Sequence, residues 1–307
     1  MTTQAVSLDP HGGDAPVYPS LSPSRAADFK TCPLLYRFRT IDRLPETTSP
    51  DQARGTLVHA VLERLFDLPA GDRTASAAAD LVAPAWATMI ENSPELADLF
   101  SGGPAVLVSE DVAVDVRPTW TTDDFLASAR SLLTGYFTVE DPSRLEPAER
   151  ESLISAVVDD QLLIRGYIDR LDVSPDGAMR VVDYKTGGAP REAFEARALF
   201  QLKFYALVLW RTRGVVPRVL RLLYLKDQEI CDYSPDAEEL ARFERNLLAL
   251  WQAIKRATEA KEFRPQPSKL CGWCSHQAVC PAFGGTPPPF PAPRKPAEEV
   301  VTPGADE

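Results

Sequence analysis

Residues 166–188 read GYIDRLDVSPDGAMRVVDYKTGG, and this stretch decides the fold. Side chains alternate across a strand, so Asp183 and Lys185 are expected on one face. The turn signal Ser-Pro-Asp-Gly at 174–177 predicts a hairpin that brings Asp169 almost opposite Asp183. Two carboxylates and an ammonium group then meet in one place. Hard oxygen ligands of this kind suit Mg²⁺ or Mn²⁺, which take further oxygens from a substrate phosphate.

A plainer interpretation is that Asp183 and Lys185 form a solvated charge pair, which is the usual role of an Asp-x-Lys on an exposed strand. The flanking residues argue against it, because Val182 precedes Asp183 and Ile168 precedes Asp169. Apolar neighbours indicate strands inside a domain, where an uncompensated carboxylate is costly. We therefore expect a cation beside these acids.

Length and composition describe an ordinary globular protein. The chain has 307 residues, of which 44% are hydrophobic, so it can bury a substantial core in one large domain or two small ones. No uninterrupted apolar stretch approaches the roughly 18 residues that a membrane span requires. The N-terminus has no basic region followed by an apolar one. We expect a cytoplasmic protein without a membrane partner.

Charge is distributed unevenly along the chain. The net charge is −11, which by itself disfavours a partner with many phosphates. Acids outnumber bases eighteen to five between 67 and 160, whereas bases outnumber acids eight to two between 191 and 226. The basic segment follows the Asp-x-Lys strand directly. This asymmetry fits a substrate-facing side and an acidic, solvated lobe, although a charge run is more often only a soluble face.

Hydrophobic periodicity predicts helices and strands in an α/β order. Apolar residues recur at helical spacing in 57–66, in the acidic region 75–135, in 192–214 and from about 235 to 260. Strands are expected near 105–116, over 151–185 as an antiparallel meander, and over 217–227. The fold class is therefore α/β, a central mixed sheet with helices on both faces. Residues 1–20 and the Pro-rich tail 284–307 are expected to be disordered, which leaves one domain at 21–283.

Four of the five cysteines form a second group. Three lie in a C-x2-C-x5-C cluster within 271–280, and Cys32 lies far upstream; the four are Cys32, Cys271, Cys274 and Cys280. In a cytosolic setting such spacing indicates a metal centre more often than disulfides. Zinc usually takes two C-x2-C pairs, whereas a [4Fe-4S] cluster accepts a trio and one remote ligand, so the cluster is favoured. His276 keeps zinc open, and Cys231 is expected to be an ordinary thiol.

Several segments together resemble a known nuclease family, the RecB-like branch of the PD-(D/E)xK nucleases. The segments are GTLVHAVLERLF (55–66), GYIDRLD (166–172), VVDYKTG (181–187) and QLKFYALVL (201–209), bracketed by Cys32 and CGWCSHQAVC (271–280). More narrowly, the chain is similar to the iron-sulfur exonucleases related to the CRISPR adaptation nuclease and to the nuclease domain of AddB. The resemblance implies a restriction-endonuclease-like core with a helical insertion.

The resemblance also implies roles for particular residues. His59, Asp169, Asp183 and the backbone carbonyl of Tyr184 would be metal ligands, although a lone helical histidine is otherwise more often a packed core residue. Lys185 would orient the attacking water. Two more residues, Gln201 and Tyr205, match the family's Q-x3-Y and would contact the DNA backbone or support Lys185. The four cysteines of the second group would hold a structural [4Fe-4S] cluster.

The activity implied is Mg²⁺- or Mn²⁺-dependent hydrolysis of DNA, as a single-strand exonuclease in DNA repair or recombination. No G-x4-G-K-[ST] phosphate loop occurs, so unwinding would need a helicase or another repair partner. Two alternatives stay open. One is a non-catalytic DNA-binding or scaffold subunit of a helicase-nuclease or CRISPR-type complex. The other is a zinc-ribbon binding module with an incidental Asp-x-Lys.

Overall fold

The computed structural model describes residues 18–100, 106–109, 112–114, 120–189 and 195–292. It divides into two compact units. Unit 1 takes the chain up to Ala27 and again from Thr47 to Gln252, and unit 2 takes Asp28–Glu46 and the chain from Ala253 onward. Of the segments expected to be disordered, 1–17 and 293–307 lie outside the described residues. Among the described residues, no helix has both the length and the apolar character needed to span a membrane.

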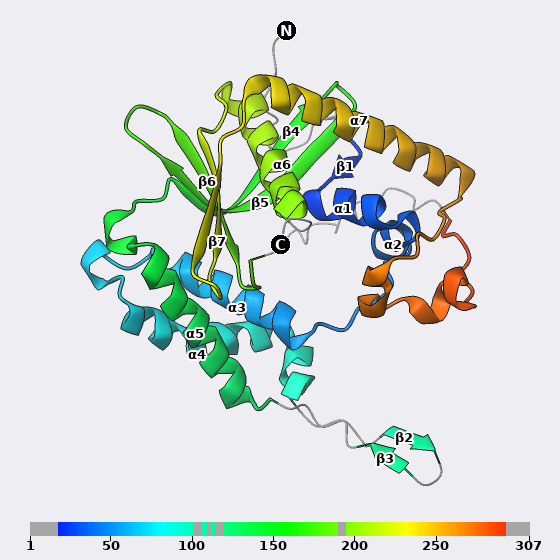
Figure 1. The fold of residues 1–307 in the computed structure, drawn as a ribbon, viewed down its shortest axis with the longest axis horizontal. Helices are drawn as coiled ribbons and strands as arrows, with labels where there is room; N and C mark the ends of the chain where they lie inside the picture. Colours follow the sequence, from blue (N-terminus) through cyan, green and yellow to red (C-terminus); the bar gives the residue numbers. More distant parts are fainter. Residues whose placement is uncertain (1–17, 101–105, 110–111, 115–119, 190–194, 293–307) are drawn as a thin grey trace, which may run out of the picture. The chain divides into compact units, whose positions relative to one another are not determined.

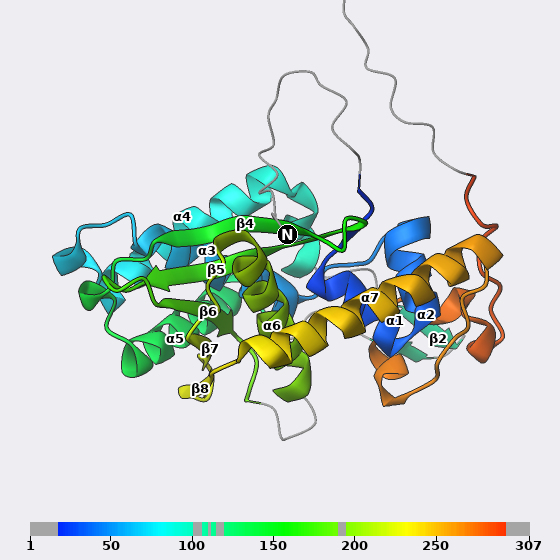
Figure 2. The ribbon, with the colours of Figure 1, turned by 90° about the horizontal axis from the view of Figure 1, so that it is seen from above.

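Unit 1 is built on a six-stranded mixed sheet (Figure 1). Its strands are β1 (Ser20–Leu21), β4 (Glu149–Val158), β5 (Leu162–Val173), β6 (Met179–Lys185), β7 (Val219–Tyr224) and β8 (Glu229–Tyr233). The order is β1-β5-β6-β7-β8, and β4 pairs with β5 as well. The pairs β1–β5 and β6–β7 are parallel, and the others are antiparallel. The expected mixed sheet is confirmed, including the antiparallel meander β4-β5-β6, whose strands run side by side in Figure 2.

Strands β5 and β6 of the meander are paired only at one end and separate at the other. The candidate functional site lies where they separate. Strand β4 pairs with β5 along nearly its whole length, so β1 and β6 must share the other edge of β5. Strand β1 pairs there with Leu163 and Ile164, and β6 pairs with the segment from Arg170 to Val173. Residues 165–169 of that edge pair with neither strand. Beyond Val182, β6 continues along β7 instead. Strands β5 and β6 therefore part at Asp169.

Helices cover both faces of this sheet, as expected. They are α3 (Pro50–Leu65), α4 (Ala75–Asn92), α5 (Thr122–Val139), α6 (Glu195–Arg213) and α7 (Ala237–Ala260). Helices α3, α4 and α5 share a buried core with Val182, Tyr184 and Leu223 of the sheet. Alternate residues of β6 point the other way, since Lys185 reaches Gln201 of α6. Helix α3 begins at a capping box in which Ser49 and Gln52 bond each other's backbone N–H groups.

Short elements complete unit 1. They are the 3₁₀ turns η2 (Ala70–Asp72), η3 (Pro94–Phe100) and η4 (Pro142–Arg144), and the strands β2 (Val106–Ser109) and β3 (Val112–Val114). The expectation of one strand over 105–116 was wrong, because β2 and β3 pair with each other as an antiparallel hairpin with an irregular register. The edge strand β8 lies outside the strand ranges given from periodicity, although the residues around Cys231 are strand-like in sequence.

Unit 2 is made of short helices and turns. They are the end of α1 (Pro23–Thr31) from Asp28 onward, α2 (Pro33–Tyr36), the π-helical η1 (Arg37–Asp42), the last turns of α7, η5 (Lys269–Trp273), η6 (Gln277–Val279) and η7 (Pro281–Phe283). Its core is aromatic: Phe29 meets Tyr36 edge to face, and Phe263 stacks on Tyr36 and on Phe290. The contacts of unit 2 thus reach Phe290, past the domain boundary expected at residue 283.

Candidate metal centre and nuclease site

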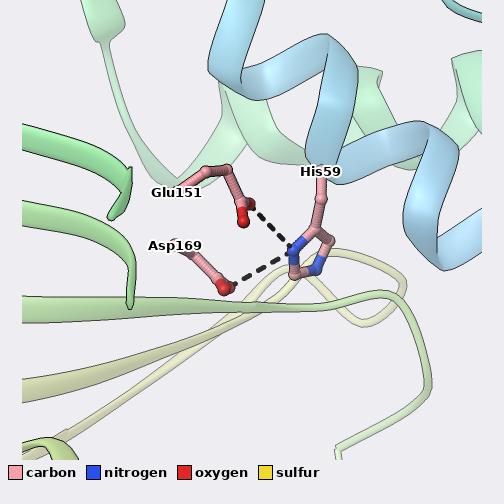
Figure 3. A group of neighbouring side chains, drawn as sticks. All are labelled: His59, Glu151 and Asp169. Carbon is pink, nitrogen blue, oxygen red and sulfur yellow. Dashed lines mark ion pairs between the residues drawn. The ribbon is translucent and has the colours of Figure 1, made fainter. Parts of the chain in front are cut away.

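Three side chains converge where β5 and β6 part (Figure 3). His59 of α3 directs Nδ1 toward two carboxylates, 3.6 Å from Glu151 Oε1 and 3.5 Å from Asp169 Oδ2. Among the described residues, this is the one group of three or more potential ligands that lie within 4.8 Å of one another. An imidazole nitrogen and two carboxylates at such distances could hold a divalent cation.

Glu151 is the member of this group that the sequence reasoning missed. The pairs Arg150↔Arg170 and Ser152↔Ile168 flank it, so Glu151 stands opposite Asp169 in the β4–β5 register. Glu151 also has a φ of 40°, a left-handed backbone conformation that is strained for a residue with a side chain. Like charges directly opposite each other destabilise a sheet unless something cationic compensates them. Strain and repulsion therefore coincide at the candidate metal centre.

The second expected acid, Asp183, makes a different contact. Its Oδ2 lies 2.5 Å from Lys185 Nζ, and the residue is only 2% exposed. Lys185 Nζ also donates to Gln201 Oε1 at 3.1 Å, and Gln201 Nε2 donates to the hydroxyl of Tyr205 at 2.9 Å. The structure thus joins four expected residues in one chain of contacts, with Asp183 held by lysine and outside the group of three.

The backbone of Tyr184 links the two halves of the site. Its N–H donates to Asp169 Oδ2 at 2.7 Å, which takes the place of a ladder bond at the opening. Its carbonyl oxygen lies 2.9 Å from His59 Nε2. A proton on Nε2 would donate to this carbonyl and leave Nδ1 free to bind a cation. In this arrangement the Tyr184 carbonyl orients the imidazole, and its role as a metal ligand stays a prediction.

The pKa values of His59 and Asp169 are both raised, so both groups tend to keep a proton when no cation is bound. Burial alone would lower the pKa of His59, but Glu151, Asp169 and Asp183 outweigh burial and raise this pKa to about 9. Burial and the nearby charge of Asp183 raise the pKa of Asp169 to about 7, against the opposing effects of His59 and the Tyr184 N–H. A divalent cation would compensate the same negative charge and displace these protons.

A buried network of ion pairs and hydrogen bonds holds the side chain of Tyr184 in place. Arg170 is fully buried, and its two terminal nitrogens lie 2.6 and 2.9 Å from the oxygens of Glu140. The same guanidinium donates to the Tyr184 hydroxyl at 2.9 Å and to Asp172 at 3.2 Å. Because Tyr184 contacts both His59 and Asp169, this network fixes the backbone that orients two members of the centre.

Comparison with known proteins identifies the family. The model of the PD-(D/E)XK nuclease superfamily matches residues 20–281. The chain belongs to this superfamily. Its sheet flanked by helices is accordingly a restriction-endonuclease-like fold, and the opening between β5 and β6 is the candidate nuclease site.

Individual relatives of this nuclease superfamily member are distant. The Gene 69 proteins of Mycobacterium phages D29 and L5 are 31% and 29% identical over 127 residues. Each match covers 40% of this chain, and 45% and 41% of the two phage proteins, so the chain spans less than half of these relatives. A crystal structure of a candidate exonuclease from Eubacterium rectale aligns with a TM-score of 0.48 and 11% identity, over 83% of this chain and 86% of the other.

Half of the bases in the segment 191–226 are paired with acids in the part of the chain that the structure describes. Four of its eight bases form ion pairs with acids, Lys203–Glu239, Arg211–Glu244, Arg213–Glu149 and Arg221–Asp232. Arg191 lies outside the described residues. These pairs neutralise much of the segment's positive charge within the fold, and a substrate-facing basic side stays a prediction.

The four cysteines of the second group all lie in unit 2 and line one cavity. None lies within a long helix or a strand: Cys32 caps α2, Cys271 lies in η5, Cys274 ends η5 and Cys280 caps η7. Backbone N–H groups of Gln266 and Ser268 point at the sulfurs of Cys32 and Cys271, each at 3.3 Å. Such N–H groups stabilise thiolates and cluster-bound sulfurs. The residues present therefore fit a metal centre.

Sulfur spacing distinguishes the kinds of centre. Tetrahedral zinc, with Zn–S bonds of about 2.3 Å, would hold its sulfurs about 3.8 Å apart. Within the described part of the chain, no three of these sulfurs lie within 4.8 Å of one another. His276, which kept zinc open, is buried, with Nε2 2.8 Å from Glu46 Oε1 and its ring against Phe38. Cys231 lies in β8 of unit 1 and does not line the cavity of the four cysteines.

Proposed function

We propose that the protein is a metal-dependent DNA nuclease, an exonuclease on single strands that serves DNA repair or recombination. The observation that carries this proposal is the convergence of His59, Glu151 and Asp169 beside Lys185, at the strand opening of a nuclease-superfamily fold. The resemblance of its motifs to iron-sulfur exonucleases supports the single-strand preference. A helicase partner would supply the unwinding.

In this proposal the cation is Mg²⁺ or Mn²⁺, held by His59, Glu151 and Asp169 with Asp183 close by. When bound, such an ion lowers the pKa of its water and polarises the scissile phosphate. Glu151 enters as a ligand that the family resemblance did not suggest. Its strained backbone and its place opposite Asp169 support the assignment.

Lys185 is the residue we assign to the reacting phosphate and the attacking water. Its ammonium group is held from two sides, by the carboxylate of Asp183 and by the amide oxygen of Gln201. Burial raises the pKa of Tyr205, so its phenol stays neutral and can hold the Gln201 amide. The chain Tyr205–Gln201–Lys185 therefore fixes an ammonium group before substrate arrives, as electrostatic catalysis requires. Gln201 and Tyr205 act as positioning residues.

For unit 2 we propose that Cys32, Cys271, Cys274 and Cys280 bind a structural [4Fe-4S] cluster. Support comes from the single cavity that all four cysteines line and from the N–H groups directed at two of the sulfurs. Iron and acid-labile sulfide analysis of anaerobically purified protein tests this assignment. A brown protein with about four irons per chain is expected, and a colourless protein that contains stoichiometric zinc would overturn it.

Digestion of end-labelled DNA tests the nuclease proposal. Single-stranded and duplex oligonucleotides, labelled at either the 5′ or the 3′ end, are incubated with anaerobically purified protein in Mg²⁺ or Mn²⁺. We expect stepwise shortening of single strands from one end and little cutting of duplex. Absence of cutting by protein with an intact cluster would sink the proposal and favour a non-catalytic binding subunit.

A further inference from the structure

A large aromatic side chain stands exposed beside the metal centre. Tyr167 lies on β5 two residues before Asp169, and 57% of its surface is accessible. Its partner across the β4–β5 ladder, Leu153, is 43% exposed. Single exposed apolar residues are common and need no explanation. The position of Tyr167 between two cavities is what sets it apart.

Tyr167 forms part of the wall of both cavities. The first has a volume of about 450 Å³ and contains His59, Glu63 and Glu151, so it is the cavity of the metal centre. The second has a volume of about 490 Å³ and contains Gln201 and Tyr205, which hold Lys185 in place. Both volumes lie within the range of roughly 300–1,000 Å³ that small ligands occupy.

The two cavities differ in charge. Ionisable side chains line the metal-side cavity, whereas no residue that lines the second cavity carries a charge. The second cavity presents the rings of Tyr167, Phe200 and Tyr205 together with polar groups of Ser22, Ser24 and Gln201. A nucleotide likewise has one charged part and one uncharged part, because its phosphate is charged and its base is a neutral aromatic ring with polar edges.

We infer that Tyr167 stacks on the base next to the scissile phosphate, with that base in the uncharged cavity and the phosphate at the metal centre. This inference rests on the proposed nuclease function and names the substrate it selects. Every base has a π-face, so stacking tolerates any sequence. A duplex base has both faces covered by its neighbours and cannot enter such a cavity. Tyr167 is therefore a specificity-determining residue for single strands.

Abasic substrates test this inference directly. A single abasic nucleotide is moved along a labelled single strand, and cleavage at each bond is measured in Mn²⁺ for the wild type, Tyr167→Ala, Tyr167→Phe and Leu153→Ala. The wild type and Leu153→Ala should cut about tenfold more slowly at the one bond whose neighbouring base is missing, from the usual strength of one base–aromatic contact. Tyr167→Ala should cut all bonds alike, wherever the abasic nucleotide lies. Tyr167→Phe keeps the ring and should retain the slower cleavage beside the abasic nucleotide.

A binding measurement separates this inference from the nuclease proposal. The affinity for a fluorescent single strand is measured in Ca²⁺, and Tyr167→Ala should bind about tenfold more weakly than the wild type or Tyr167→Phe. Cleavage and binding by Tyr167→Ala at wild-type levels, with the abasic effect retained, would overturn the stacking role and leave the nuclease proposal intact. A wild type that binds single strands but does not cut them would contradict the nuclease proposal alone. No binding to single strands would refute both.

Discussion

The carboxylate centre of unit 1 and the cysteine group of unit 2 are built from different kinds of structure. His59, Glu151 and Asp169 come from a helix and two paired strands, above a fully buried arginine network. The cysteines lie in or at the ends of a short helix and 3₁₀ turns, and all four are half-buried. The sheet thus preforms the first centre, whereas we expect the turns around the second to be held together by the metal centre proposed there.

The largest loss of stability is expected in unit 2, for which we propose a structural metal centre. Cys274→Ser should abolish the visible absorption of the protein and expose unit 2 to limited proteolysis, because the binding energy of a structural metal centre, on the order of 10 kcal/mol, is also folding energy. Cys231→Ser is the matched control and should keep colour and protease resistance. An iron content unchanged in Cys274→Ser would show that this sulfur is no ligand.

Arg170 tests whether the sheet itself holds the carboxylate centre. Arg170→Met should reduce the free energy of unfolding by about 3–5 kcal/mol in urea, since Glu140 and Asp172 would lose their one fully buried cation and keep only the partly exposed Arg180 and Arg221. Arg242→Ala removes an exposed ion pair with Glu238 and should cost no more than about 0.5 kcal/mol. Equal losses in the two variants would mean that the buried network does not anchor this centre.

Lys185 separates catalysis from metal binding within the carboxylate centre. Lys185→Ala should lower the cleavage rate by about 100- to 1,000-fold, the usual loss when one preorganised electrostatic group is removed, while Mn²⁺ still binds. Lys226→Ala removes an exposed lysine from the β7–β8 connection and should cut at the wild-type rate. Full activity in Lys185→Ala would remove this residue from the proposed mechanism.

Glu151 should give the smallest of these effects. Glu151→Gln should weaken Mn²⁺ binding by about 10- to 100-fold, measured by calorimetry, because one charged oxygen is lost while the other ligands stay in place. The loss of the repulsion between the half-buried Glu151 and Asp169 should leave the free energy of unfolding of the metal-free protein equal or higher. Unchanged Mn²⁺ affinity would limit Glu151 to a backbone role.

Local sequence patterns predicted those elements whose structure depends on residues close together in the sequence. The Ser-Pro-Asp-Gly turn predicted the β5–β6 hairpin, and helical periodicity predicted α3, α6 and α7. The mixed character of the sheet also followed from the order of the elements. Strand β1 was missed because it is short and pairs with β5, which is distant in sequence. The edge strand β8 pairs with its sequence neighbour β7, but it is short and largely exposed, so it gives little hydrophobic signal.

Among the proposed metal ligands and catalytic residues of the candidate site, the sequence motifs missed only Glu151, whose place depends on the register between β4 and β5. A three-residue connection joins β4 to β5, so Glu151 and Asp169 stand at equal distances from it: Val158 pairs with Leu162, and each acid lies seven residues beyond. Counting outward from this turn would have found Glu151. The ion pairing of the basic segment could not be predicted, because its acidic partners come from elements distant in sequence, such as Glu149 for Arg213.

The central claim is that His59, Glu151 and Asp169 hold the cation on which DNA cleavage depends. The most direct test measures bound Mn²⁺ by electron paramagnetic resonance and cleavage of a labelled single strand in the same samples, for the wild type and Asp169→Asn. The wild type should bind Mn²⁺ and cut, and Asp169→Asn should do neither while it keeps its cluster and melting temperature. Mn²⁺-dependent cleavage by Asp169→Asn at the wild-type rate would contradict the account.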